Sequence, residues 1–127
     1  RIIEALPDGD QGRTYGCMGG LIRLPLKDRD IILFSNLDTD ASHRERISVW
    51  ASFDGGKSWP VKRLVDAGRS GYSSLAVGRN QSFSAGWIYL LYEHDPFKGA
   101  HIVRFNLTWV LNGTLTGDGA IPNLRLN

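Results

Sequence analysis

The chain has 127 residues, of which 42% are hydrophobic and 22% are charged, and its formal net charge at pH 7 is +2. This composition is typical of one ordinary globular domain and excludes an intrinsically disordered chain. The weak net charge and the scattered basic residues argue against a nucleic-acid partner, and no apolar run reaches the roughly 18 residues that a membrane-spanning helix needs.

Short apolar or alternating segments, separated by turns, follow one another along the chain. Residues 1–16 are rich in Pro, Asp and Gly and are expected to form a connecting strand and then a loop. A first group of four strands is then predicted, because each segment is bounded by Gly, Pro or charged turn residues. These strands are expected at residues 18–24, 31–35, 47–53 and 61–65.

The pattern starts again after residues 68–71, with strands expected at 72–77, 87–92 and 102–107. No helical period persists for three turns, so the chain is predicted to be all-β. A repeated four-stranded unit indicates a β-propeller, and since a propeller ring needs about four to eight blades, two units and a remainder make only part of one. We therefore expect residues 1–127 to be the C-terminal part of a longer propeller domain. A small sandwich formed by these strands alone is the alternative.

The turn after the third predicted strand reads Ser-Phe-Asp-Gly-Gly-Lys-Ser-Trp, from Ser52 to Trp59. Asp54 can accept hydrogen bonds from the turn amides, the glycines permit positive φ, and Trp59 can fold back over the turn. The pattern Ser-x-Asp-x-Gly-x-x-Trp resembles the Asp-box, or BNR repeat, of β-propeller sialidases. In that family the box caps a blade away from the active site, so Ser52, Asp54, Gly56 and Trp59 are expected to be structural.

Further segments resemble the sialidase (neuraminidase) family. Residues 71–75, Gly-Tyr-Ser-Ser-Leu, and residues 88–93, Ile-Tyr-Leu-Leu-Tyr-Glu, are similar to two sialidase segments that follow each other in the same order. Residues 17–22 resemble the family's Cys-Gln-Gly-Ser-Leu-Leu strand, with departures at Met18 and Gly20, and residues 31–36 resemble its strand ending in Phe-Ser-Asn. The resemblance extends from Cys17 to about Trp109.

The resemblance implies a six-bladed propeller with exo-α-sialidase activity. Such an enzyme hydrolyses terminal α-linked sialic acid from glycoconjugates with retention, through a tyrosyl-enzyme intermediate. The partners it implies are a sialylated glycoconjugate and the remaining propeller blades. The family also implies an Asp, a Glu and two arginines upstream of this chain, so the 127 residues alone are expected to be inactive.

The resemblance implies that Tyr72 is the catalytic nucleophile. Sialic acid carries a carboxylate on its anomeric carbon, so a neutral phenol avoids the repulsion that a carboxylate nucleophile would meet. A phenol with an ordinary pKa of about 10 needs a base at neutral pH, and sialidases with a Tyr nucleophile are an exception to the two-carboxylate scheme. The alternative for Tyr72 is an aromatic side chain that packs at a strand edge.

Arg44 and Glu93 complete the implied site. The family's last carboxylate-binding arginine stands about eight residues before the Ser of the final Asp-box, which corresponds to Arg44, and a guanidinium can donate two parallel hydrogen bonds to a carboxylate. Arg46 competes for this role, because strand alternation would place both arginines on one face. A solvated charge cluster is the other alternative for Arg44. Glu93 is implied to orient one of the arginines, and its alternative is an exposed residue at a strand end.

No cofactor or metal is expected. Cys17 has no His placed to activate it, and the resemblance implies a buried structural Cys there. The spacing of His43, His94 and His101 suggests neither a metal site nor a catalytic triad, so all three are expected at the surface or in loops.

Two other functions stay open at this point. One is a non-catalytic Asp-box propeller that binds carbohydrate or protein. The other is an enzyme of the same superfamily that acts on a different sugar acid or transfers the sugar instead of hydrolysing it.

Overall fold

The computed structural model describes residue 6 and residues 17–39, 43–95, 99–112 and 114–115, to which all structural statements refer. The connecting strand and loop predicted over residues 1–16 lie outside the described residues, except for Leu6. The described elements are β1 (Gly20–Arg23), β2 (Ile32–Leu37), β3 (Glu45–Ser52), β4 (Val61–Val77), β5 (Ile88–His94), β6 (Ala100–Phe105), α2 (Leu107–Leu111) and β7 (Thr114–Leu115). None of the helical segments in this part of the chain is long and apolar enough to cross a bilayer.

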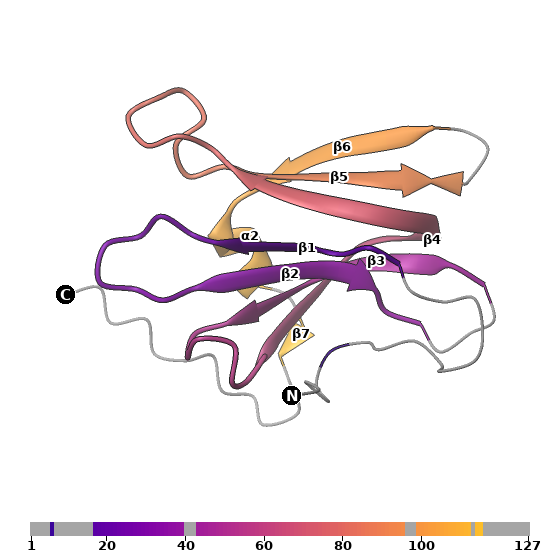
Figure 1. Ribbon diagram of the computed structural model, residues 1–127, viewed down its shortest axis with the longest axis horizontal. Coiled ribbons are helices and arrows are strands. Elements are labelled where there is room, and N and C mark those ends of the chain that lie inside the picture. Colours follow the sequence, from indigo (N-terminus) through magenta and orange to yellow (C-terminus); the bar gives the residue numbers. More distant parts are fainter. Residues whose placement is uncertain (1–5, 7–16, 40–42, 96–98, 113, 116–127) are drawn as a thin grey trace.

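The strands pair in the order in which they occur along the chain (Figure 1). β1 to β6 form consecutive antiparallel pairs, and β7 pairs with β4. β4 belongs to both halves of the molecule, since its first part pairs with β3 and residues 70–77 pair with β5. In Figure 1, β5 and β6 lie above the second part of this long strand and β1 and β2 lie below that part. The all-β prediction is confirmed for the described residues apart from α2, and the arrangement is consistent with part of a propeller.

Two boundaries differ from the prediction. The glycine-rich segment 68–71 was expected to end one unit, but β4 runs through it. The Asp66 carboxylate accepts the amide hydrogen of Gly68 at 2.7 Å, and the register with β5 shifts between Ser70 and Ser73, so a bulge replaces the expected break. The last predicted strand ends at Phe105, because the Asn106 side chain caps α2 by accepting a hydrogen bond from the Trp109 amide.

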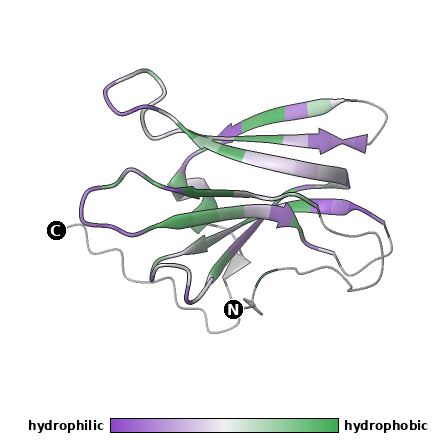
Figure 2. Ribbon diagram, viewed as in Figure 1, coloured by the Kyte–Doolittle hydropathy of each residue, from purple (hydrophilic) through white to green (hydrophobic). Residues whose placement is uncertain are grey.

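The core follows from strand alternation. In β2, buried residues alternate with half-buried ones, whereas Ile47–Ser52 of β3 are all buried because this strand is covered on both faces. Figure 2 shows hydrophobic residues in the strands and hydrophilic residues in the turn between β1 and β2. The buried core cluster consists of Leu24, Ile31, Leu33, Leu37, Ile47, Val49, Ala51, Val61, Leu75, Ile88, Leu90, Tyr92, Phe105 and Val110.

Buried serines connect the two halves of the molecule. The Ser35 and Ser73 hydroxyls lie 2.9 Å apart, and Ser35 Oγ also accepts the amide hydrogen of Gly20 at 3.1 Å. Ser35 lies on β2 and Ser73 on the second part of β4, so this hydrogen bond joins elements that are not neighbours in the strand order. Buried hydroxyls need such partners, because an unpaired one is costly.

The turn from Ser52 to Trp59 has the contacts that the sequence predicts for it. Asp54 accepts hydrogen bonds from the amides of Lys57 and Ser58 and from the hydroxyls of Ser52 and Ser58. The Ser58 hydrogen bonds are the main reason why the pKa of Asp54 is lowered to about 2. Gly55 and Gly56 adopt φ of 75° and 85°. Trp59 is buried and contacts Phe34 edge-on, at 6.1 Å between ring centroids.

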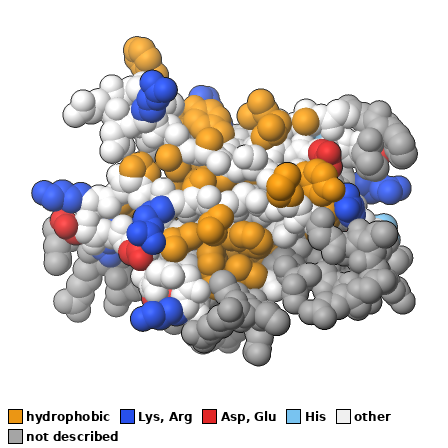
Figure 3. All heavy atoms as spheres, viewed as in Figure 1, with side chains coloured by type: hydrophobic (Ala, Val, Ile, Leu, Met, Phe, Trp, Pro, Cys, Tyr) orange, Lys and Arg blue, Asp and Glu red, His pale blue; other side chains and the backbone are white. Residues whose placement is uncertain are grey.

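Several large hydrophobic side chains remain exposed. Leu91 and Ile102 are register partners on β5 and β6, and Ile102 is 71% exposed. Leu21 on the edge strand β1 is 65% exposed. Figure 3 shows hydrophobic side chains at the surface in several patches rather than one.

Candidate functional site

The main chain around Tyr72 is held by three separate segments. The amide of Ser70 donates to the carbonyl of Arg44 at 3.2 Å, and the amide of Ser73 donates to the carbonyl of Met18 at 2.9 Å. Between them, the Tyr72 amide donates to Glu93 Oε2 at 3.0 Å. These bonds attach β4 to the start of β3, to the segment before β1 and to the end of β5. The position of Tyr72 therefore depends on the backbone of Arg44 and Met18 and on the side chain of Glu93.

Glycine at position 71 is required by this arrangement. Gly71 is buried, and a Cβ atom added there would clash with the Glu93 carboxylate and approach Glu93 Cβ to 3.2 Å. Only a residue without a side chain allows Glu93 to reach the Tyr72 amide.

The Arg44 guanidinium lies over the Tyr72 ring. Its central carbon is 5.2 Å from the ring centroid, which is a cation–π distance, and such contacts contribute about 0.5–1 kcal/mol at exposed sites. Arg44 is half-buried and the Tyr72 side chain is 43% exposed. Tyr72 is thus neither a buried packing aromatic nor an isolated surface residue, because a charged group and solvent both reach its ring.

Arg46 occupies a different environment. Its φ is +62°, and register shifts on both sides of Ile47 interrupt the strand alternation that was expected to place Arg44 and Arg46 on one face. Arg46 Nε donates to the carbonyl of Asp38 at 3.2 Å, so its side chain contacts the start of the loop that follows β2. Of the two arginines, Arg44 is the one in contact with Tyr72.

Glu93 and Cys17 lie beside these residues. Glu93 is exposed, as its alternative interpretation predicted, but its carboxylate also holds the Tyr72 amide. Burial raises the pKa of the Cys17 thiol, while Arg44 lowers it and Glu93 raises it further, so both charges lie near this sulfur. A raised thiol pKa disfavours the nucleophilic thiolate. The structure thus brings Arg44, Tyr72 and Glu93 together, with a partly buried thiol close by.

The chain is 30% identical, over 125 residues and 98% of its length, to a protein named Sialidase from Micromonospora viridifaciens. The chain is related to a sialidase. It spans 16% of the length of this sialidase. No family model matches the chain.

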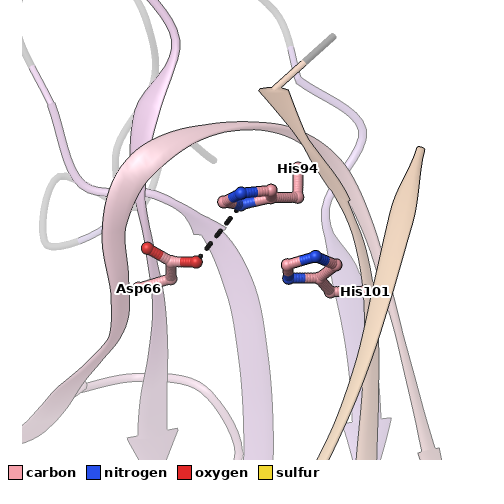
Figure 4. A group of neighbouring side chains, drawn as sticks. All are labelled: Asp66, His94 and His101. Atoms are coloured by element: carbon pink, nitrogen blue, oxygen red, sulfur yellow. Dashed lines mark ion pairs between the residues drawn. The ribbon is translucent and has the colours of Figure 1, made fainter. Parts of the chain in front are cut away.

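A second polar cluster involves two of the histidines. Asp66 of β4, His94 at the end of β5 and His101 of β6 converge, as Figure 4 shows. The His94 and His101 rings stack at 4.0 Å between centroids, and His94 Nδ1 is 3.4 Å from Asp66 Oδ2. The expectation that the histidines share no site is therefore wrong for His94 and His101, whose side chains meet beside Asp66, although His101 is exposed as expected. His43 is also exposed as expected, and it pairs with Glu45 at 2.8 Å.

The electrostatics of this cluster are set by Asp66 and Tyr92. The Gly68 amide hydrogen bond is the largest cause of a lowered pKa at Asp66, and the hydrogen bond from the Tyr92 hydroxyl, at 2.8 Å, lowers it further. Burial and the neighbouring carboxylate raise the pKa of Tyr92 to about 12. At neutral pH the cluster therefore holds a carboxylate and a neutral phenol beside two imidazoles. The sequence predicts strands on both sides of residues 94–101, and a hairpin between them is the signal that could have indicated this cluster. The observed register places His94 and His101 diagonally on one face of the hairpin.

Proposed function

We propose that this chain contributes part of the active site of a retaining exo-α-sialidase of the sialidase family. Tyr72 is the nucleophile, Arg44 binds the substrate carboxylate, and Glu93 holds the main chain of Tyr72 in place. The observation that carries the proposal is the contact of the Arg44 guanidinium with the Tyr72 ring at 5.2 Å. Relationship to a sialidase over 98% of the chain supports it.

The contact matters because of the shape of sialic acid. The carboxylate of this sugar is bonded to the anomeric carbon, so a group that binds the carboxylate and a nucleophile that attacks that carbon must be neighbours. A guanidinium offers two parallel donors to a carboxylate, and its positive charge offsets the negative charge of the substrate next to the phenol. Arg44 beside a partly exposed Tyr72 meets both requirements.

The proposed reaction has two steps. The Tyr72 oxygen loses its proton to a Glu and forms a bond to the anomeric carbon while an Asp protonates the departing glycosidic oxygen. Water then attacks the same carbon while the Asp takes its proton, the tyrosyl bond breaks, and the Glu returns the proton to Tyr72. Two displacements at one centre give retention. The Glu and the Asp are implied by the family resemblance and are assigned to no residue of this chain.

We also propose that the chain is part of a six-bladed propeller. Two features support this: β4 passes from one antiparallel group of strands to the next, and apolar side chains on β1, β5 and β6 are exposed where further blades would pack. The hydrogen bonds that Asp54 accepts within the Ser52–Trp59 turn support the proposal that this turn is an Asp-box. A propeller that only binds carbohydrate or protein is not favoured by the relationship to a sialidase.

The proposal is tested by covalent trapping. The full-length protein that contains this chain is incubated with a fluorinated sialic acid carrying a good leaving group, and the labelled peptide is identified by mass spectrometry. We expect label on Tyr72, and we expect Tyr72→Phe to abolish it. Tyr89→Phe is the matched control, because Tyr89 lies on β5 and has no place in the proposed site.

The arginine assignment is tested in the same assay with a fluorogenic sialoside. Arg44→Lys keeps the charge and loses the planar pair of donors, so kcat/KM should fall by about 10- to 100-fold, equal to roughly 1.4–2.7 kcal/mol of transition-state binding. Arg46→Lys is the control and should change kcat/KM little. Label on a residue other than Tyr72, or a larger loss with Arg46→Lys than with Arg44→Lys, would contradict the proposal.

A further inference from the structure

We propose that Asp66, His94 and His101 form a binding site for one divalent transition-metal ion of the Zn²⁺ type. The three side chains come from β4, β5 and β6, and one potential ligand atom from each lies within 4.8 Å of the others (Figure 4). This site is separate from the proposed sialidase chemistry.

The donor set selects the class of ion. Two imidazole nitrogens and one carboxylate oxygen suit Zn²⁺ and its neighbours in the first transition row, whereas Ca²⁺ and Mg²⁺ prefer sites built from oxygen alone. Zinc bonds to nitrogen and oxygen are about 2.0–2.2 Å long, so neighbouring ligand atoms of a tetrahedral ion lie roughly 3.3–3.6 Å apart. The distance of 3.4 Å between His94 Nδ1 and Asp66 Oδ2 already falls in this range.

The buried Nδ1 atom of His94 also indicates a ligand. Its Nδ1 atom is buried and has no hydrogen-bond partner among the described residues, although it faces the Asp66 carboxylate. A buried polar atom without a hydrogen bond is unfavourable, and a bond to a metal ion would satisfy it. His101 needs the larger adjustment, because its ring stacks on His94 and its Nδ1 lies 3.4 Å from the Tyr92 hydroxyl. His101 is exposed, so its ring would turn from this stack at the protein surface.

The carboxylate is held in place by neighbours that would orient it toward an ion. The Gly68 amide donates to Oδ1 and the Tyr92 hydroxyl donates to Oδ2, which leaves a lone pair on Oδ2 for the metal. The side chains of His94 and Asp66 are 31% and 26% exposed, so water can fill the remaining coordination positions. Three protein ligands with an open position are a recognised zinc arrangement.

The ion would tie three strands together at one end. His94 directly follows Glu93 on β5, and Asp66 precedes the bulge that leads to Tyr72 on β4. A ligand that binds only the folded state raises the melting temperature. At a free Zn²⁺ concentration 100 times the Kd, we expect a rise of roughly 5 to 15 °C.

The test is a Zn²⁺ titration of EDTA-treated protein by calorimetry, repeated with Co²⁺ and followed by its visible absorption. Wild type should bind one Zn²⁺ per chain at this site, and both His101→Ala and Asp66→Asn should weaken binding by at least about tenfold. His43→Ala is the matched control, because His43 is exposed and lies outside the cluster, and it should leave the affinity unchanged.

Two results would overturn the assignment. The first is the absence of saturable binding to wild type up to about 1 mM Zn²⁺. The second is an affinity that stays the same in both His101→Ala and Asp66→Asn while those variants keep the wild-type circular dichroism. A loss of affinity in His43→Ala equal to that in His101→Ala would likewise move the site elsewhere.

Discussion

Replacing Ser35 by alanine should destabilise the protein through the contact between its two halves. Ser35 is fully buried, and its hydroxyl accepts the Gly20 amide at 3.1 Å and exchanges a hydrogen bond with Ser73 Oγ at 2.9 Å. Each such bond contributes about 0.5–1.5 kcal/mol net, so losing both should lower the free energy of unfolding by about 1–3 kcal/mol. Ser73→Ala also removes the shared bond and should cost about 1–2 kcal/mol.

The two substitutions should not be additive. Because both single variants lose the same Ser35–Ser73 hydrogen bond, the double variant should be less destabilised than the sum by about 0.5–1.5 kcal/mol. Urea unfolding followed by tryptophan fluorescence measures these energies, since the chain has four Trp residues. Ser74→Ala is the control: Ser74 is the exposed neighbour of Ser73, and its change should stay within about 0.5 kcal/mol.

Either of two outcomes would contradict the predicted contact between Ser35 and Ser73. Ser35→Ala could prove as mild as Ser74→Ala, which would mean that the buried hydroxyl is dispensable. Alternatively, the Ser35 and Ser73 changes could add within about 0.3 kcal/mol, which would mean that the two hydroxyls do not interact.

Two further predictions concern the turn and the nucleophile. The folded-state pKa of Asp54, about 2, is depressed from the ordinary 3.8, so its contribution to stability is present above pH 3.8 and is lost as the pH falls toward 2. Asp54→Asn should therefore flatten the fall in unfolding free energy between these pH values, and an unchanged slope would contradict the assignment. Gly71→Ala should displace the Glu93 carboxylate from the Tyr72 amide and lower sialidase activity while the fold persists, as circular dichroism would check. In a protein that already carries Glu93→Ala, Gly71→Ala should lower sialidase activity little further. If Gly71→Ala lowered the activity there as much as in the wild type, displacement of Glu93 would not be the reason for the loss.

The strand pattern was predictable because alternation and turn residues are local signals. Each strand predicted between residues 18 and 107 falls in a described element, from 31–35 in β2 to 87–92 in β5, although 61–65 and 72–77 both belong to the single strand β4. The sequence did not predict that β4 runs through residues 68–71 without a break, because this depends on the hydrogen bond from the Gly68 amide to the Asp66 carboxylate. The glycines at 68 and 71 favour a loop by propensity, and the sheet pairing on either side overrides them. Helix α2 was missed because its five residues are too short for a period to show.

The two polar clusters differ in what the sequence could reveal. Resemblance to family motifs predicts Arg44, Tyr72 and Glu93 as site residues, whereas their closeness in space depends on pairings between strands that are distant in the sequence. The histidine cluster has no motif, since His94 and His101 meet only through the register of the β5–β6 hairpin. A one-residue shift in that register would turn one ring to the opposite face of the sheet.

The geometry of the candidate active site follows from backbone bonds more than from side-chain packing. The Ser70 amide donates a hydrogen bond to the carbonyl of Arg44. Because Ser70 lies two residues before Tyr72 on β4, this bond holds the backbone of Arg44 close to Tyr72. The bulge between Ser70 and Ser73 then turns the intervening residues out of the regular alternation, so the Tyr72 amide meets a Glu93 carboxylate instead of a backbone carbonyl. Arg44 and Tyr72 are therefore neighbours because β3 pairs with β4 before the bulge and β5 pairs with β4 on both sides of it. Any substitution that removes the bulge should separate the guanidinium from the phenol even though it touches neither side chain.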